Sequence, residues 1–69
     1  MTQQEKVLEY IKKHGSITPM EAFSELGITR LAARVNEMGR KGIILERARV
    51  NAKNRYGESV SYMRYWLED

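Results

Sequence analysis

The chain of 69 residues has no cysteine, one histidine and one proline, and it lacks any long apolar run. Without cysteine, neither disulfides nor thiolate metal sites can form, and one histidine cannot build a zinc site or a proton relay. No apolar stretch approaches the roughly 20 residues of a membrane-spanning helix, and the first residues lack the apolar core of a secretory signal. We therefore expect a cytoplasmic protein without metal, cofactor, membrane contact or enzymatic activity.

The length allows one small domain, and we predict that residues 1–69 form it. Hydrophobic residues make up 42% and charged residues 30%, which is typical of a folded chain and not of a disordered tail. A chain of this length buries only about 60% of its extended surface, so the predicted core is compact.

Positive charge is concentrated in the middle of the sequence. Residues 30–56 hold eight of the 12 Lys and Arg residues and two Glu, while residues 1–29 and 57–69 are both net acidic. Such asymmetry is typical of proteins that bind a polyanion, most often nucleic acid. The alternative is that the basic side chains only keep a small domain soluble.

Three helices are predicted, at residues 3–14, 19–26 and 30–41. Each follows a threonine that can cap it and ends at a glycine: Thr2 and Gly15, Thr18 and Gly27, Thr29 and Gly42. Glu5 and Glu21 lie three residues after the first two caps and complete capping boxes. The apolar positions of the second helix are Met20, Ala22, Phe23 and Leu26.

From Ile43 onward the pattern alternates and predicts strands at about 44–53 and 58–67. Asn54 suits the start of a type I turn and Gly57 the left-handed residue after it, so Asn54 would face Glu58. One face of this hairpin then carries Glu46, Ala48, Val50 and Ala52 opposite Trp66, Arg64, Tyr62 and Val60. The other carries Arg47, Arg49, Asn51 and Lys53 opposite Tyr65, Met63, Ser61 and Ser59. We expect the aromatic residues Tyr62, Tyr65 and Trp66 to close the core.

Three helices followed by a two-stranded β-hairpin make an α+β fold, the winged helix-turn-helix arrangement. The second and third helices would form the helix-turn-helix, and the hairpin would be the wing. In this arrangement the third helix enters the major groove of DNA.

The predicted third helix directs Leu31, Val35 and Met38 inward. Its outward face is predicted to carry Arg30, Ala33, Asn36, Glu37 and Arg40, with Arg34 and Lys41 at one flank. Arg30 suits guanine and Asn36 suits adenine, while a small Ala33 lets the helix approach the bases. Arg34, Arg40 and Lys41 are predicted to contact phosphates. The alternative is an ordinary solvated helix face.

Two further groups are candidate DNA contacts. Thr18 and Thr29 cap helices whose free N–H groups can also bind phosphate. Lys53, Asn54, Arg55 and Tyr56 lie at the hairpin turn, where an exposed Arg suits a narrow minor groove.

The run ITPMEAFSELGITRLAARVNEMGRKG, followed by KNRYGE and YMRYWL, resembles small winged helix-turn-helix proteins encoded by phages and prophages. The resemblance implies a stand-alone DNA-binding regulator. The positions that match are Thr29, Arg30, Arg34, Arg40 and the turn from Lys53 to Gly57. Phe23 stands four residues before Gly27, where many bacterial repressors carry Ala, so we expect a wider helix angle or repacking against the wing.

Three functions fit these features. The first is a sequence-specific double-stranded DNA-binding regulator of transcription, and the second is an excisionase-like protein that bends DNA. The third is a phage inhibitor of a host protein, such as a polymerase or a CRISPR effector. The charge distribution favours DNA. A homodimer on a palindromic site would have to use the outside of the first helix or the hairpin edge.

Overall fold

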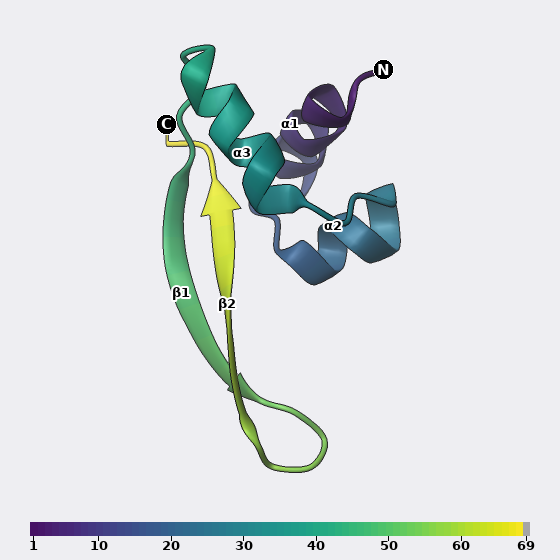
Figure 1. The fold of residues 1–69 in the computed structure, drawn as a ribbon, viewed down its shortest axis with the longest axis vertical. Coiled ribbons are helices and arrows are strands. Elements are labelled where there is room, and N and C mark those ends of the chain that lie inside the picture. Colours follow the sequence, from purple (N-terminus) through teal and green to yellow (C-terminus); the bar gives the residue numbers. More distant parts are fainter. Residues whose placement is uncertain (69) are drawn as a thin grey trace.

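The computed structural model describes residues 1–68. Three helices, α1 (Gln3–His14), α2 (Pro19–Leu26) and α3 (Leu31–Arg40), precede the strands β1 (Glu46–Lys53) and β2 (Ser59–Trp66). Figure 1 shows the helices gathered at one end and the hairpin extending from them as a long curved ribbon. This is the predicted α+β order of three helices followed by an antiparallel hairpin.

The first two helices begin at the predicted capping boxes. The Thr2 hydroxyl accepts a hydrogen bond from Glu5 N at 3.1 Å, and Glu5 Oε1 accepts one from Thr2 N at 2.9 Å. Thr18 and Glu21 repeat the exchange at 3.3 and 2.9 Å. The hydrogen bonds from Thr2 favour the ionised carboxylate and lower the pKa of Glu5. Each box therefore satisfies N–H groups that a helix start leaves open.

The third helix begins later than predicted, and the prediction that Thr29 caps it is wrong. Arg30 occupies the N-cap position with φ −125° and ψ 61°, and no side chain caps the helix. Ile28 and Leu31 are both 2% exposed, so both side chains lie in the core. The two residues between them, Thr29 and Arg30, are exposed at the surface. Thr29 is thereby exposed one residue too early to cap. The helix also ends at Arg40, one residue before the predicted end.

The core draws on every helix and on the base of the hairpin. Its buried members are Val7, Ile11, Ile17, Ala22, Ile28, Leu31, Val35, Met38, Leu45 and Tyr65. Burying each large apolar side chain contributes about 1.5–3 kcal/mol, so this single cluster holds α3 in place.

Helix α2 contradicts the expectation for Phe23. Ala22 is completely buried, while Phe23 is 58% exposed. Ala22 and Leu26 are four residues apart and share the inward face, so Phe23 is rotated by about 100° toward solvent. Phe23 lies outside the core and is not among the side chains packed against it, so it is not placed between α2 and α3 where it could widen their angle.

The hairpin has the predicted register, from Glu46 opposite Trp66 to Lys53 opposite Ser59. Gly57 has a φ of 77°, and its N–H donates to Asn54 O at 3.0 Å. A further bond of 3.0 Å runs from Asn54 N to Glu58 O and closes the turn. The left-handed residue after the turn is therefore Gly57, as the turn chemistry requires.

The hairpin strands are shorter than predicted. β1 begins at Glu46 instead of residue 44, and β2 spans Ser59–Trp66 instead of 58–67. The reason at the first end is Leu45, which is only 3% exposed because it turns into the core, whereas Ile44 is 72% exposed. The segment between α3 and β1 therefore follows the core and not the extended ladder.

An isolated bridge joins the hairpin to the connection between α1 and α2. Ile17 N donates to Tyr65 O at 2.8 Å, and Tyr65 N donates to Ile17 O at 2.9 Å. Of the three aromatic residues expected to close the core, only Tyr65 is buried, while Tyr62 and Trp66 are half-buried on the opposite face of the hairpin. The prediction is therefore wrong for those two.

Candidate nucleic-acid interface

One side of α3 is open to solvent. Ala32, Asn36, Gly39 and Arg40 are exposed, at spacings that place them on one face of the helix. We call these four residues the exposed stripe of α3. Leu31, Val35 and Met38 pack the opposite side into the core. The exposed stripe offers an amide and a guanidinium between small side chains, and Arg30 is exposed at the helix start.

The flank of α3 next to α1 is half covered, unlike the prediction that placed Ala33 and Glu37 on the open face. Ala33, Arg34 and Glu37 are all half-buried. Gln4 of α1 donates from Nε2 to Glu37 Oε1 at 3.2 Å, and Lys41 Nζ donates to Gln4 Oε1 at 3.2 Å. The first turn of α1 therefore lies against this flank and shifts the open face toward Ala32 and Gly39.

Glu37 is the one acidic residue of α3, and its charge is neutralised. Arg34 Nη1 donates to Glu37 Oε1 at 3.0 Å, and the Gln4 amide reaches the same oxygen. The Arg34 Nε is buried without a hydrogen-bond partner among residues 1–68. Because Arg34 is held by Glu37, the positive charges left open are those of Arg30 before the helix, Arg40 in its last turn and Lys41 directly after it.

Gly39 on the exposed stripe was not singled out from the sequence. The other glycines all have positive φ, but Gly39 does not, and a Cβ built on it would meet no atom within 4 Å. Glycine inside a helix costs about 1 kcal/mol relative to alanine. Neither backbone nor packing requires this residue. The sequence could have drawn attention to Gly39, because Gly42 three residues later already supplies the glycine that ends the helix.

The two capping threonines differ in accessibility. Thr18 is 7% exposed, and its hydroxyl donates to Glu21 Oε1 at 3.1 Å while accepting from Glu21 N. Its hydroxyl is therefore committed to the start of α2. Thr29 is exposed in the turn between α2 and α3.

The hairpin tip stands free of the rest of the molecule. Residues 51–60 are all exposed, and Tyr56 is 79% exposed. Asn54 Oδ1 accepts hydrogen bonds from Tyr56 N at 2.9 Å and Glu58 N at 3.1 Å, so Asn54 shapes the turn. Arg55 and Tyr56 occupy the two central positions of that turn. Figure 1 shows the tip well away from all three helices.

One face of the hairpin carries Arg47, Arg49 and Lys53, which we call the cationic face. Tyr65 lies opposite Arg47 on this face and is buried at its base, and the Arg47 guanidinium lies 5.5 Å from the centre of the Tyr65 ring. The cationic face is therefore on the same side of the sheet as the helical core.

Residues 2–69 match a family model described as a winged helix-turn-helix domain. The chain belongs to that winged helix-turn-helix family. No curated protein and no solved structure matches it. Winged helix-turn-helix domains bind DNA and are typically not enzymes, so membership points to DNA as the partner. Across residues 1–68, no helix has the length and apolarity needed to cross a membrane.

In this winged helix-turn-helix domain, α2 and α3 form the helix-turn-helix, and β1 and β2 form the wing. The structure brings Arg30, Asn36 and Arg40 to the open side of α3 and places Lys53, Arg55 and Tyr56 on the exposed part of the wing. Glu37 and Lys41 form hydrogen bonds with Gln4 of α1, and Arg34 is held by Glu37 within α3. Contacts of any of these residues with DNA remain predictions.

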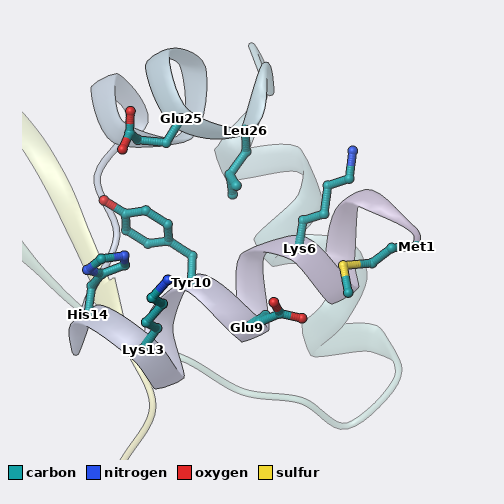
Figure 2. Close-up of a pocket in the computed structure, with 8 residues that line it drawn as sticks. All are labelled: Met1, Lys6, Glu9, Tyr10, Lys13, His14, Glu25 and Leu26. Carbon is teal, nitrogen blue, oxygen red and sulfur yellow. The ribbon is translucent and has the colours of Figure 1, made fainter.

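An open groove lies between α1 and α2 of the domain (Figure 2), with a volume of about 420 Å³. It is lined by Met1, Lys6, Glu9, Tyr10, Lys13, His14, Glu25 and Leu26. Burial and the nearby Glu21 and Glu25 raise the pKa of Tyr10 above its usual value. Lysines and glutamates alternate around the groove, which gives no net attraction for a polyanion.

Proposed function

We propose that this protein is a sequence-specific regulator of transcription that binds double-stranded DNA, of the kind that phages and prophages encode. The observation that carries the proposal is the exposed stripe of α3, which follows the helix-turn-helix turn and presents no acidic group. Its polar side chains are an amide and a guanidinium, the groups that form paired hydrogen bonds with adenine and guanine in the major groove. The ion pair of Glu37 with Arg34, together with the hydrogen bond from Gln4, supports this proposal.

The proposed contacts divide by accessibility. Arg30 and Asn36 read base edges, and Gly39 with Ala32 lets the helix come close to them. Arg40 and Lys41 contact phosphates near the end of α3, and Thr29 contacts one at the turn. Arg34, Ala33 and Glu37 support α3 from its half-buried flank, and Thr18 acts through the helix start that it caps.

The wing provides the second contact region. Arg55 and Tyr56 reach the minor groove or the backbone from the hairpin tip, while Asn54 holds the turn in shape. Lys53 contacts a phosphate from the cationic face. Electrostatic attraction from these exposed side chains orients the domain, because phosphate contacts fix register without reading sequence.

The dependence of DNA affinity on salt tests the proposal. With a duplex of random sequence, log K should fall by about 0.9 unit per log unit of salt for each neutralised phosphate, so several contacts give a slope of several units. Lys53→Ala should reduce the slope by about one. Lys12→Ala removes the same charge from exposed α1 and is the matched control, with the slope of the parent.

A slope near zero for the parent protein contradicts the DNA proposal. It favours the second candidate function, inhibition of a host protein such as a polymerase or a CRISPR effector. One observation supports that candidate: Met20 and Phe23 are 73% and 58% exposed side by side on α2, where they offer an apolar surface. Strong bending of the bound duplex, measured by energy transfer between its ends, would instead indicate an excisionase-like architectural protein.

A further inference from the structure

The face of the hairpin that points away from the helices is largely apolar, and its side chains are exposed or half-buried. It carries Ala48, Val50 and Ala52 on β1 and Val60, Tyr62 and Trp66 on β2, with Glu46 and Arg64 near its base. We call these eight residues the outer face. None of them belongs to the buried core or to the side chains packed against it. Two-stranded hairpins are only marginally stable alone, so a partner that covers this face would stabilise the hairpin.

The two strands contribute side chains of different size to the outer face. Ala48 and Ala52 lie on β1, the larger Tyr62, Arg64 and Trp66 lie on β2, and each strand also contributes one valine, Val50 or Val60. The β2 side chains of the outer face therefore project further than most of those on β1. A second copy fits if the β2 side chains of each copy pack over the β1 side chains of the other.

Only one symmetry axis produces that fit. With a two-fold axis parallel to the strands, β2 of each copy lies over β1 of the other. Tyr62 then lies over the partner's Val50, and Val60 lies over the partner's Ala52. A two-fold axis perpendicular to the strands would instead place the large β2 side chains of one copy over those of the other. The contact is isologous, as in most homodimers, and both hairpin tips point in the same direction.

The charges of the outer face are complementary in the same arrangement. Arg64 lies over the partner's Ala48, beside the partner's Glu46, and the two-fold axis forms this pair twice. Within residues 1–68 neither Arg64 nor Glu46 has an ion pair. The neighbouring Glu68 raises the pKa of Glu46 through a side-chain hydrogen bond and through its negative charge.

The area of the outer face sets the strength of the contact. Four residues on each of two strands cover about 20 Å by about 10 Å, or roughly 200 Å². Stable complexes bury about 800 Å² on each partner, so the contact is too small to hold two free copies together. Two copies already bound to neighbouring stretches of DNA have a high effective concentration and need no larger area.

We propose that the outer face of the hairpin binds the outer face of a second copy of this chain when both copies occupy DNA. This inference rests on the proposed DNA-binding function. The cationic face lies on the opposite side of the same ribbon, so DNA and the second copy use different faces. The contact makes binding of neighbouring copies cooperative.

DNA binding and the contact between two copies can be tested separately with two duplexes of random sequence. The short duplex accommodates one copy, and the longer one accommodates two. On the longer duplex the second copy should bind about tenfold tighter than the first, within the usual range of coupling between sites. Arg64→Glu and Glu46→Arg should each abolish this cooperativity, because each variant places like charges at both pairs of the dimer. Gel mobility shift reads singly and doubly bound species directly.

An equal mixture of the two single variants is the decisive arm. In a mixed dimer, the glutamate introduced at position 64 of one chain faces the arginine introduced at position 46 of the other. The native Glu46 and Arg64 that remain also face each other, so both pairs are attractive again and cooperativity should return. An effect inside each chain alone cannot be rescued in this way. Glu9→Arg and Lys12→Glu on α1 are matched charge changes and should keep the cooperativity of the parent.

Ala52→Arg provides a test that is independent of the ion pair. The large arginine side chain on β1 would block packing of the partner's β2 side chains, so cooperativity on the longer duplex should be lost. Because the substitution adds a positive charge, binding to the short duplex should not weaken. Independent binding of two parent copies, or a mixture without rescue, overturns the second-copy contact. Failure of the parent to bind the short duplex overturns the proposed function itself.

Discussion

The guanidinium of Arg34 lies 3.0 Å from the carboxylate of Glu37, one turn further along α3. The same carboxylate oxygen accepts a hydrogen bond from Gln4, so two helices meet at this ion pair. The side chains are 28% and 39% exposed, and a pair so open to solvent contributes at most about 1 kcal/mol to stability. Its larger effect is on the surface charge of α3.

Glu37→Gln tests that effect. The variant releases Arg34 and removes one negative charge near the exposed stripe, so it should bind random duplexes more tightly and with a steeper salt dependence. The melting temperature should change little. Fluorescence anisotropy at several salt concentrations provides the comparison. If the variant instead loses preference at a single base pair, Glu37 reads a cytosine and the assignment as a support of Arg34 is wrong.

Gly39→Ala should separate stability from binding. Alanine fits without contact and has higher helix propensity, so the variant should be more stable by up to about 1 kcal/mol. The added methyl group lies on the exposed stripe, so specific binding should weaken if the helix backbone approaches DNA closely. Gly57→Ala is the contrast, since its φ of 77° makes alanine strained and costs about 1 kcal/mol. A more stable Gly39→Ala with unchanged affinity would exclude close approach.

The double substitution Arg55→Ala, Tyr56→Ala tests the wing. Both residues lie on the exposed tip, so the free energy of unfolding should stay within about 0.5 kcal/mol of the parent. Affinity for DNA should fall clearly. Asn54→Ala is the structural comparison, because it removes the acceptor that holds the turn. Unchanged binding by the double variant would leave α3 as the only contact region.

The pH dependence of stability should have opposite signs at two glutamates. Glu68 raises the pKa of Glu46, so the folded protein favours the protonated carboxyl and loses this contribution as pH rises through the usual and then the raised value. Glu46→Gln should therefore melt higher than the parent at neutral pH and converge with it in acid.

Glu5 provides the matched control for that pH dependence. Its pKa is lowered by Thr2, so its contribution is present above the usual pKa and is lost as pH falls through the lowered value. Glu5→Gln should melt lower than the parent at neutral pH and converge with it at low pH. Thermal melting monitored by circular dichroism at several pH values decides both cases. Parallel shifts of the two variants would contradict the assignment of these pKa directions.

Local rules of the sequence predicted much of this fold. The Asn54 and Gly57 turn chemistry fixed the hairpin register, because only an odd-length turn keeps the two faces of the ribbon distinct. The capping boxes at Thr2 and Thr18 likewise placed two helix starts.

The predictions that were wrong, for the start of α3 and for its open face, depended on contacts between segments distant in the sequence. Thr29 has the residue type of a cap, but burial of both Ile28 and Leu31 decided where α3 begins. Glu37 is outward by helical period, yet α1 covers that flank through Gln4, 33 residues away. The exposed stripe therefore includes Ala32 and Gly39, which periodicity within the helix did not indicate.

The most direct test of the central claim is nuclear magnetic resonance of the labelled protein titrated with duplex DNA. A 69-residue chain gives one resolvable backbone signal for nearly every residue. We predict that the largest shifts fall on Ala32, Asn36, Gly39 and Arg40 and on the hairpin tip, with little change at Glu9 and Lys12 on α1. Shifts confined to α1 and the groove beside α2, with α3 unperturbed, would contradict the proposed interface.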